Sequence, residues 1–212
     1  MRAMLAKMAI LLVPAAAGLG CGGGNGGPGP EPEPDPVLTT VQVTPATASL
    51  FTVAPGNSVT LAAVGRDQNG QNMSGLGPAT FSSGDDAVAT VSADGAVTGV
   101  GAGTTPITAS LTADGVTQTG SMSVTVQVAP ATASVTAPAL QFQPTVADVS
   151  AGGTVTWTMS GIPHNVTFTS AGAPASVPDT QNGSAERTFP GSGSFGYRCT
   201  IHPEMTGTVR VH

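Results

Sequence analysis

The C-terminal part of the chain reads Ser194-Phe-Gly-Tyr-Arg-Cys-Thr-Ile-His-Pro-Glu-Met-Thr-Gly-Thr-Val-Arg-Val211. Side chains alternate along residues 194–199 and 207–211, and a period of two is typical of β-strands. Between these runs, Cys199, His202 and Met205 follow one another at intervals of three residues. The stretch therefore predicts two strands joined by a short loop that presents a thiol, an imidazole and a thioether together.

A second histidine extends this set. His164 lies 35 residues before Cys199, after another strand-like run. Two imidazoles and a thiolate form trigonal copper sites, in which a thioether is the weaker axial ligand. Zinc usually takes four ordinary ligands and rarely a thioether. The sequence thus favours one copper ion, as Cu(I) or Cu(II), at His164, Cys199, His202 and Met205.

Each of these residues has a more ordinary explanation when it is taken alone. A single Cys is usually a small buried hydrophobe, a single Met fills a gap in a core, and a single His more often makes a hydrogen bond than binds a metal. A disulfide between Cys21 and Cys199 is a further alternative, which we disfavour because it would link a strand end to the far side of a flexible tether. We interpret His212, the last residue, as incidental to the site.

The motifs Pro163-His-Asn-Val-x-Phe168 and Phe195-x-Tyr-x-Cys-x-x-His-x-x-Met-x-Gly207 resemble those of plastocyanin-like cupredoxins. The resemblance covers nearly all of residues 131–212 and implies a Greek-key β-sandwich with a type 1 copper bound by the four residues named above. It also implies that Asn165 ties the two ligand-bearing segments together by hydrogen bonding. Pro203, next to His202, is expected to stiffen the loop and shield the ligand. The ligand loop is shorter than that of plastocyanin and has the length seen in amicyanin.

Composition excludes several other classes. The chain has 212 residues, with 6 Lys and Arg against 12 Asp and Glu, and only 8% of its residues are charged. It lacks the cations that a nucleic-acid binder needs to neutralise phosphates. Three histidines are too few for an oxidase with a trinuclear copper cluster, so we do not expect an enzyme. Thr, Val, Ser and Gly predominate over good helix formers, which predicts an all-β protein of two tandem sandwiches.

The first sandwich is expected over residues 38–128 and the second over residues 129–212. Asn69-Gly70, Asp94-Gly95 and Asp114-Gly115 are hairpin turns between alternating runs. The motifs Val41-x-Val-x-Pro45 and Val88-Ala-Thr-Val-Ser-x-x-Gly-x-Val-Thr-Gly-Val100 resemble bacterial Ig-like domains of group 2. That resemblance implies a structural spacer or adhesive stalk. In the second sandwich, the polar stretch 169–186 is expected to be a loop.

The N-terminal residues have the pattern of a secretory signal. Arg2 and Lys7 precede an apolar run that is too short to span a membrane, so residues 1–20 are predicted to be a signal peptide. Cys21 follows Gly20 as in a bacterial lipobox, which implies lipidation at Cys21; the alternative is an ordinary signal peptide and an incidental cysteine. Residues 21–37, rich in Gly and Pro, are expected to be a disordered tether.

These features together predict an extracytoplasmic blue copper protein, held in the periplasm or at the cell surface by an N-terminal lipid. It would exchange single electrons with a transiently bound redox partner, such as a cytochrome or another oxidoreductase. Sequestration or delivery of periplasmic copper is one alternative. A structural or adhesive surface protein with a vestigial cupredoxin domain is another.

Overall fold

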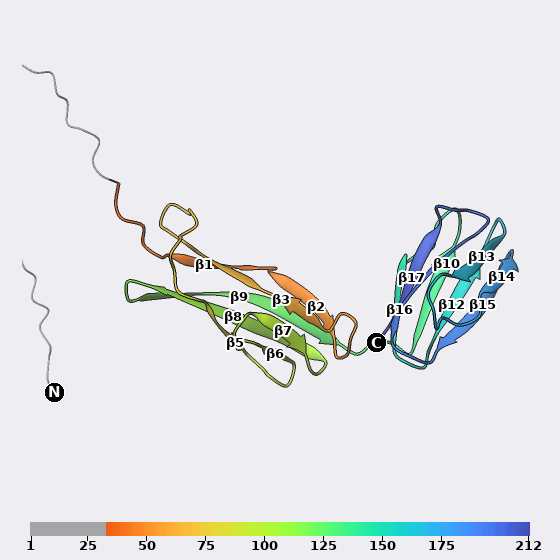
Figure 1. The fold of residues 1–212 in the computed structure, drawn as a ribbon, viewed down its shortest axis with the longest axis horizontal. Helices are drawn as coiled ribbons and strands as arrows, with labels where there is room; N and C mark the ends of the chain where they lie inside the picture. The colour runs from red at the N-terminus through yellow and green to blue at the C-terminus, as the bar shows by residue number, and fades with distance from the viewer. Residues whose placement is uncertain (1–32) are drawn as a thin grey trace, which may run out of the picture. The chain divides into compact units, whose positions relative to one another are not determined.

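A computed structural model describes residues 33–212, which form β-strands and no helix (Figure 1). The predicted signal peptide, Cys21 and most of the predicted tether lie outside these residues. Within the described range, no helix is long and apolar enough to cross a membrane. The prediction of an all-β protein with two domains is confirmed.

The N-terminal domain is built from β1 (Thr40–Thr44), β2 (Thr47–Phe51), β3 (Ser58–Thr60), β4 (Ala62–Arg66), β5 (Thr80–Ser83), β6 (Ala89–Val91), β7 (Ala96–Gly99), β8 (Gly103–Ala113) and β9 (Val116–Gln127). One sheet has the order β2-β9-β8-β5, a second has the order β3-β7-β6, and β1 pairs with β4. Ile107, Val124 and Val97 from the two larger sheets share one apolar core, so these sheets pack face to face.

Alternation decides which side chains enter that core. Along β8, every second residue from Thr105 to Leu111 is buried, while the intervening residues are exposed or half-buried. Asp114 and Gly115 both have positive φ, at 49° and 78°, and they join β8 to β9 as the two-residue turn that the sequence predicted. The turn fixes the register, so that the apolar faces of β8 and β9 coincide.

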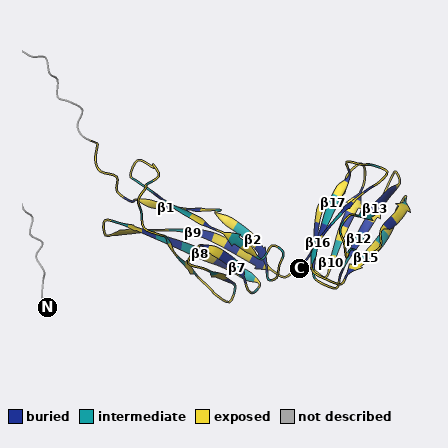
Figure 2. Ribbon diagram, viewed as in Figure 1, coloured by how far each residue is buried: buried dark blue, intermediate teal, exposed yellow. Residues whose placement is uncertain are grey.

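The C-terminal domain is built from β10 (Thr132–Ala137), β11 (Val146–Val149), β12 (Gly153–Met159), β13 (His164–Phe168), β14 (Val177–Thr180), β15 (Gly183–Phe189), β16 (Gly193–Arg198) and β17 (Thr206–Val211). Its two sheets have the orders β10-β12-β15 and β11-β17-β16-β13-β14. Figure 2 shows buried residues along strands of both sheets. Their inward faces enclose a single core.

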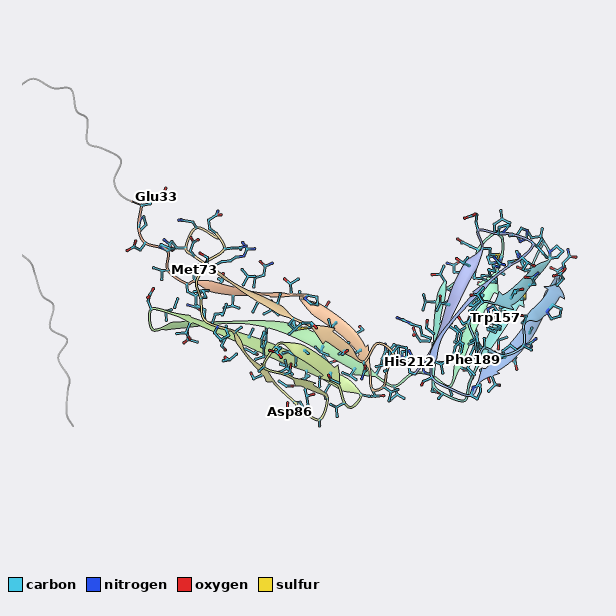
Figure 3. All side chains as sticks on the ribbon, in the orientation of Figure 1. Glu33, Met73, Asp86, Trp157, Phe189 and His212 are labelled. Atoms are coloured by element: carbon cyan, nitrogen blue, oxygen red, sulfur yellow. The ribbon has the colours of Figure 1, made fainter. Side chains whose placement is uncertain are left out.

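Aromatic rings fill much of this second core. Trp157 is fully buried in it, edge-on to Tyr197 at 5.5 Å between ring centroids and to Phe168 at 5.9 Å. Phe189 lies at 6.5 Å from the same indole (Figure 3). Edge-to-face pairs of this kind add to the stabilisation that ring burial provides, and they hold β16, the strand before the ligand loop, against β12.

One predicted loop is wrong. Residues 169–186 contain β14 and the first half of β15, which pairs with β12 from Gly153↔Phe189 to Met159↔Gly183. The apolar alternation of β15 is weak, because the residues it directs inward include only Ala185 and the stem of Arg187 before Phe189. Cross-strand pairing, rather than its own pattern, therefore makes this segment a strand. Residues 141–143 form no strand and make only an isolated bridge between Gln143 and Thr136.

Candidate metal centre

The ligand loop is a closed turn between β16 and β17. The two strands are in register at Arg198↔Thr206, so Cys199 and Met205 are the first and last residues of the loop. Cys199 donates its backbone N–H to the Met205 carbonyl at 2.9 Å, and Met205 donates to the His202 carbonyl at 2.9 Å. These bonds fix the backbone at all three residues, which the sequence had grouped by their spacing.

β13 supplies the second histidine through an irregular pairing. His164 is opposite Thr180 and Val166 is opposite Val177, so Asn165 faces two residues of β14, Pro178 and Asp179. This is a β-bulge, which re-aims side chains locally. The residues from 164 to 166 are accordingly all buried instead of alternating, and the His164 imidazole lies in the interior near the ligand loop.

Three candidate ligands converge. One ring nitrogen each of His164 and His202 and the sulfur of Cys199 all lie within 4.8 Å of one another. The Cys199 sulfur is 3.6 Å from His202 Nδ1, and the two imidazole centroids are 5.0 Å apart. His164 and Cys199 are fully buried, whereas His202 is half-buried. The His202 ring is therefore the part of the cluster that reaches the surface.

The chemistry of this cluster fits a copper ion. Both ring nitrogens of His164 are buried and have no hydrogen-bond partner, which is rare for buried polar atoms. Burial, together with the charge of the neighbouring His202, lowers the pKa of His164, so its imidazole is neutral at neutral pH and has a free lone pair. A neutral imidazole beside a buried free thiol and a second imidazole is a soft donor set of the kind that copper prefers.

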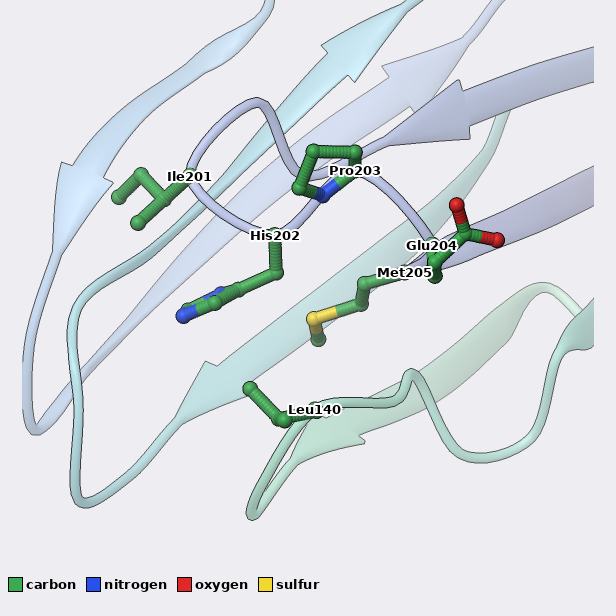
Figure 4. Close-up of a pocket in the computed structure, with 6 residues that line it drawn as sticks. All are labelled: Leu140, Ile201, His202, Pro203, Glu204 and Met205. Carbon is green, nitrogen blue, oxygen red and sulfur yellow. The ribbon is translucent and has the colours of Figure 1, made fainter.

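Met205, the last residue of the loop, lies beside His202 in one hollow. Its side chain is 1% exposed, and its thioether extends toward the same hollow as the His202 ring (Figure 4). This hollow has a volume of about 240 Å³, and the surface that its lining residues expose to it is almost wholly apolar. It is lined by Leu140, Ile201, His202, Pro203, Glu204 and Met205. Pro203, expected to stiffen the loop, thus forms part of the surface next to His202.

Asn165 links the two ligand-bearing segments. Its Oδ1 accepts the backbone N–H of Thr200 at 2.9 Å, and its Nδ2 donates to Thr200 Oγ1 at 2.7 Å. Its backbone N–H points at the Cys199 sulfur at 3.5 Å. Nδ2 also donates to Asp179 Oδ1 at 2.8 Å. Sequence reasoning missed Thr200 and Asp179; Asp179 in particular lies in the segment expected to be a loop.

The third histidine lies apart from the cluster. His212 is 4% exposed, and its Nε2 lies 2.8 Å from Asp148 Oδ1. It therefore has a structural contact of its own with Asp148, which sequence reasoning did not predict.

Two family models match the chain. Residues 37–119 match bacterial Ig-like domains of group 2. Residues 129–212 match copper binding proteins of the plastocyanin/azurin family. None of the curated proteins matches the chain.

Several solved structures are similar to part of it. A reduced Cu(I) form of an amicyanin mutant is 30% identical; the match covers 41% of this chain and 87% of the amicyanin chain, with a TM-score of 0.36. Amicyanin from Paracoccus versutus is 28% identical; the match covers 38% of this chain and 81% of the amicyanin chain, with a TM-score of 0.34. A purple cupredoxin from Nitrosopumilus maritimus is 26% identical; the match covers 38% of this chain and 99% of the cupredoxin chain, with a TM-score of 0.35.

Proposed function

We propose that this chain, whose residues 129–212 form a copper-binding domain of the plastocyanin/azurin family, is a blue copper protein that carries single electrons between redox partners. The observation that supports this most directly is the convergence of a buried thiol and two imidazoles, one of which has no other polar partner. Copper, when bound to such donors, supplies a reversible one-electron couple.

We propose His164, Cys199, His202 and Met205 as the residues that hold the ion. His164, Cys199 and Met205 are buried, so they keep water away from it. The hydrogen bonds that close the loop, and those that Asn165 makes to Thr200, hold the donors in place independently of the metal. A preformed site of this kind limits the rearrangement that accompanies each electron.

Electrons would enter and leave at His202, the candidate ligand that reaches the surface. The hollow beside it is apolar, and Leu140 and Ile201 at its margin are 63% and 42% exposed. A small apolar surface suits the brief contacts of redox proteins, whose interfaces are at the small end of the range. Without the predicted signal peptide and its Arg2 and Lys7, the chain has 4 Arg against 12 Asp and Glu, and this acidic charge would steer a basic partner, such as a cytochrome, toward the protein.

The location of the protein is part of the proposal. The basic and apolar residues before Cys21 support export, and Cys21 supports attachment to a membrane through a lipid. Residues 37–119, as an Ig-like domain, would then act as a spacer that carries the copper domain away from the membrane. Growth with labelled palmitate, comparing the natural chain with Cys21→Ser, tests the anchor.

The copper assignment is tested by the optical and EPR spectra of the Cu(II)-loaded full chain. Cys199→Ser should abolish the blue thiolate charge-transfer band, because the thiolate is its source. Cys21→Ser is the matched control, since it removes the other cysteine of the chain and should leave the band unchanged. A Cys199→Ser variant that stays blue would contradict the assignment. A reversible midpoint potential supports electron transfer, whereas rapid handover of copper to apo-proteins would favour copper delivery.

A further inference from the structure

We infer that Asp179 is a positioning residue of the copper site, which acts through Asn165 to fix the segment around Cys199. This inference rests on the function proposed above, and it concerns a residue outside the four candidate ligands. Asp179 belongs to β14, a strand that contributes no candidate ligand. Its contact with the site comes from the bulge between β13 and β14.

The bulge explains why a carboxylate reaches Asn165. Two residues of β14, Pro178 and Asp179, occupy the space opposite Asn165. Proline has no N–H to donate to a strand ladder, so the regular pairing is interrupted at this point. Asp179 Oδ1 then lies 2.8 Å from Asn165 Nδ2, where a regular ladder would have directed successive side chains to opposite faces.

The partners of Asn165 allow only one orientation of its amide. The backbone N–H of Thr200 can only donate, so the carbonyl oxygen of the amide must face it. An ionised carboxylate can only accept, so the NH2 group must face Asp179. The Thr200 hydroxyl, at 2.7 Å from Nδ2, could either donate or accept and so does not decide the orientation. Asp179 is therefore the side-chain partner that rules out a flipped amide.

The orientation of the Asn165 amide also affects the position of the Cys199 thiol. Asn165 is 5% exposed, whereas Asp179 is exposed and the bond between them is partly buried. Without Asp179, water can reach the Nδ2 proton only from the Asp179 side, and it would replace a fixed acceptor by a mobile one, which weakens the hold on the amide. Asn165 holds Thr200, the residue next to Cys199, and its own N–H points at the Cys199 sulfur. Outer-shell partners of this kind orient the residues that bind a metal.

The experiment compares two substitutions of one residue in the full chain. Asp179→Ala removes the acceptor, whereas Asp179→Asn keeps an oxygen acceptor of the same shape. Asp179→Ala should weaken Cu(II) binding about 10- to 100-fold and shift the EPR and charge-transfer spectra, and Asp179→Asn should restore most of both. Glu186→Ala is the matched control. Like Asp179, Glu186 is an exposed carboxylate; it lies on β15, the next strand along the chain, and accepts from Thr156 at 3.2 Å.

A second readout needs no metal. In the copper-free protein, Asp179→Ala should speed hydrogen exchange of the Thr200 amide by about five- to tenfold, as expected for a weakened hydrogen bond. In an Asn165→Ala background, the same substitution should have no further effect on exchange at Cys199 and its neighbours, since Asp179 acts through Asn165. An unchanged Thr200 exchange rate, or copper affinity in Asp179→Ala equal to that of Glu186→Ala, would overturn the inference.

The two proposals fail in different ways. If the natural chain does not become blue with copper, the proposed function fails, and the exchange of Thr200 still decides whether Asp179 positions Asn165. If the natural chain is blue and reversible but Asp179→Ala matches it in affinity, spectrum and exchange, the copper site remains and the role of Asp179 is wrong.

Discussion

The two domains have interiors of different chemistry. In the N-terminal domain the buried side chains are almost all aliphatic, and Thr105 is the one buried polar residue among its described positions. In the C-terminal domain aromatic rings pack among the aliphatic side chains of the core, and His164, Asn165 and His212 are buried as well. Every buried side-chain polar atom that lacks a hydrogen bond in residues 33–212 also lies there. Such atoms are costly, and the two ring nitrogens of His164 are the ones among them that belong to the candidate metal cluster.

The largest expected effect comes from the aromatic core. Trp157 is fully buried, so Trp157→Ala should cost about 3–5 kcal/mol of unfolding free energy in the C-terminal domain. Ile107→Ala, in the aliphatic core, should cost about 2–5 kcal/mol in the N-terminal domain. The two cores share no residue, so hydrogen exchange should increase in β12 and β16 for the first variant and in β8 and β9 for the second. Equal acceleration in all four strands would show that the two cores are not separate.

A smaller effect is expected at one glycine in each domain. A Cβ on Gly207 would overlap the Tyr197 ring, its partner across β16 and β17, whereas a Cβ on Gly120 would overlap the Val41 carbonyl oxygen. A ring can shift and a backbone carbonyl cannot do so easily. Gly120→Ala should therefore be the more destabilising, within the range of about 1–3 kcal/mol typical of overpacking.

The two glycine substitutions should also differ in their effect on the spectrum of the bound copper. Tyr197 is two residues before Cys199, so Gly207→Ala should shift the blue band of the copper-loaded protein, whereas Gly120→Ala should leave it unchanged. Thermal unfolding and optical spectra of both variants check this. A shifted band in Gly120→Ala, or an unshifted one in Gly207→Ala, would contradict the distinction between the two domains.

Local features of the sequence were enough for much of the fold and for the core of the site. Asp114-Gly115 marks its own hairpin because its two residues must have positive φ. Cys199, His202 and Met205 could be grouped because a single loop contains them, and His164 joined them through its spacing and the family resemblance.

Pairings between distant segments could not be predicted in the same way. Asp179 reaches Asn165 through a bulge, and no local pattern encodes a bulge on a weakly alternating strand. The partner of His212 depends on the parallel pairing of β11 with β17, which joins residues more than 60 positions apart. The sequence therefore indicated where the donors are, and the tertiary structure was needed to find what holds them.

That parallel pairing also gives the smallest expected effect, a dependence of stability on pH. Asp148 lies opposite Arg210 and accepts from its Nε at 2.8 Å and its Nη2 at 2.9 Å, with His212 Nε2 also at 2.8 Å. Burial raises the pKa of Asp148, but the hydrogen bonds and charges of Arg210 and His212 outweigh burial and hold this pKa below its ordinary value of 3.8. A lowered pKa in the folded state means that the carboxylate stabilises the fold above about pH 4, and that this stabilisation is lost as the pH falls further.

Asp148→Asn should therefore lower the stability of the C-terminal domain at pH 7 by only about 1 kcal/mol, since the side chains of Arg210 and Asp148 are 41% and 23% exposed and water screens the pair. Urea unfolding of the copper-free protein should show the gap between Asp148→Asn and the natural chain closing from pH 6 to pH 2. Asp86→Asn, at an exposed position of the N-terminal domain, is the control and should change stability by less than about 0.5 kcal/mol at any pH. A gap that is constant with pH would mean that Asp148 contributes through packing and not through its charge.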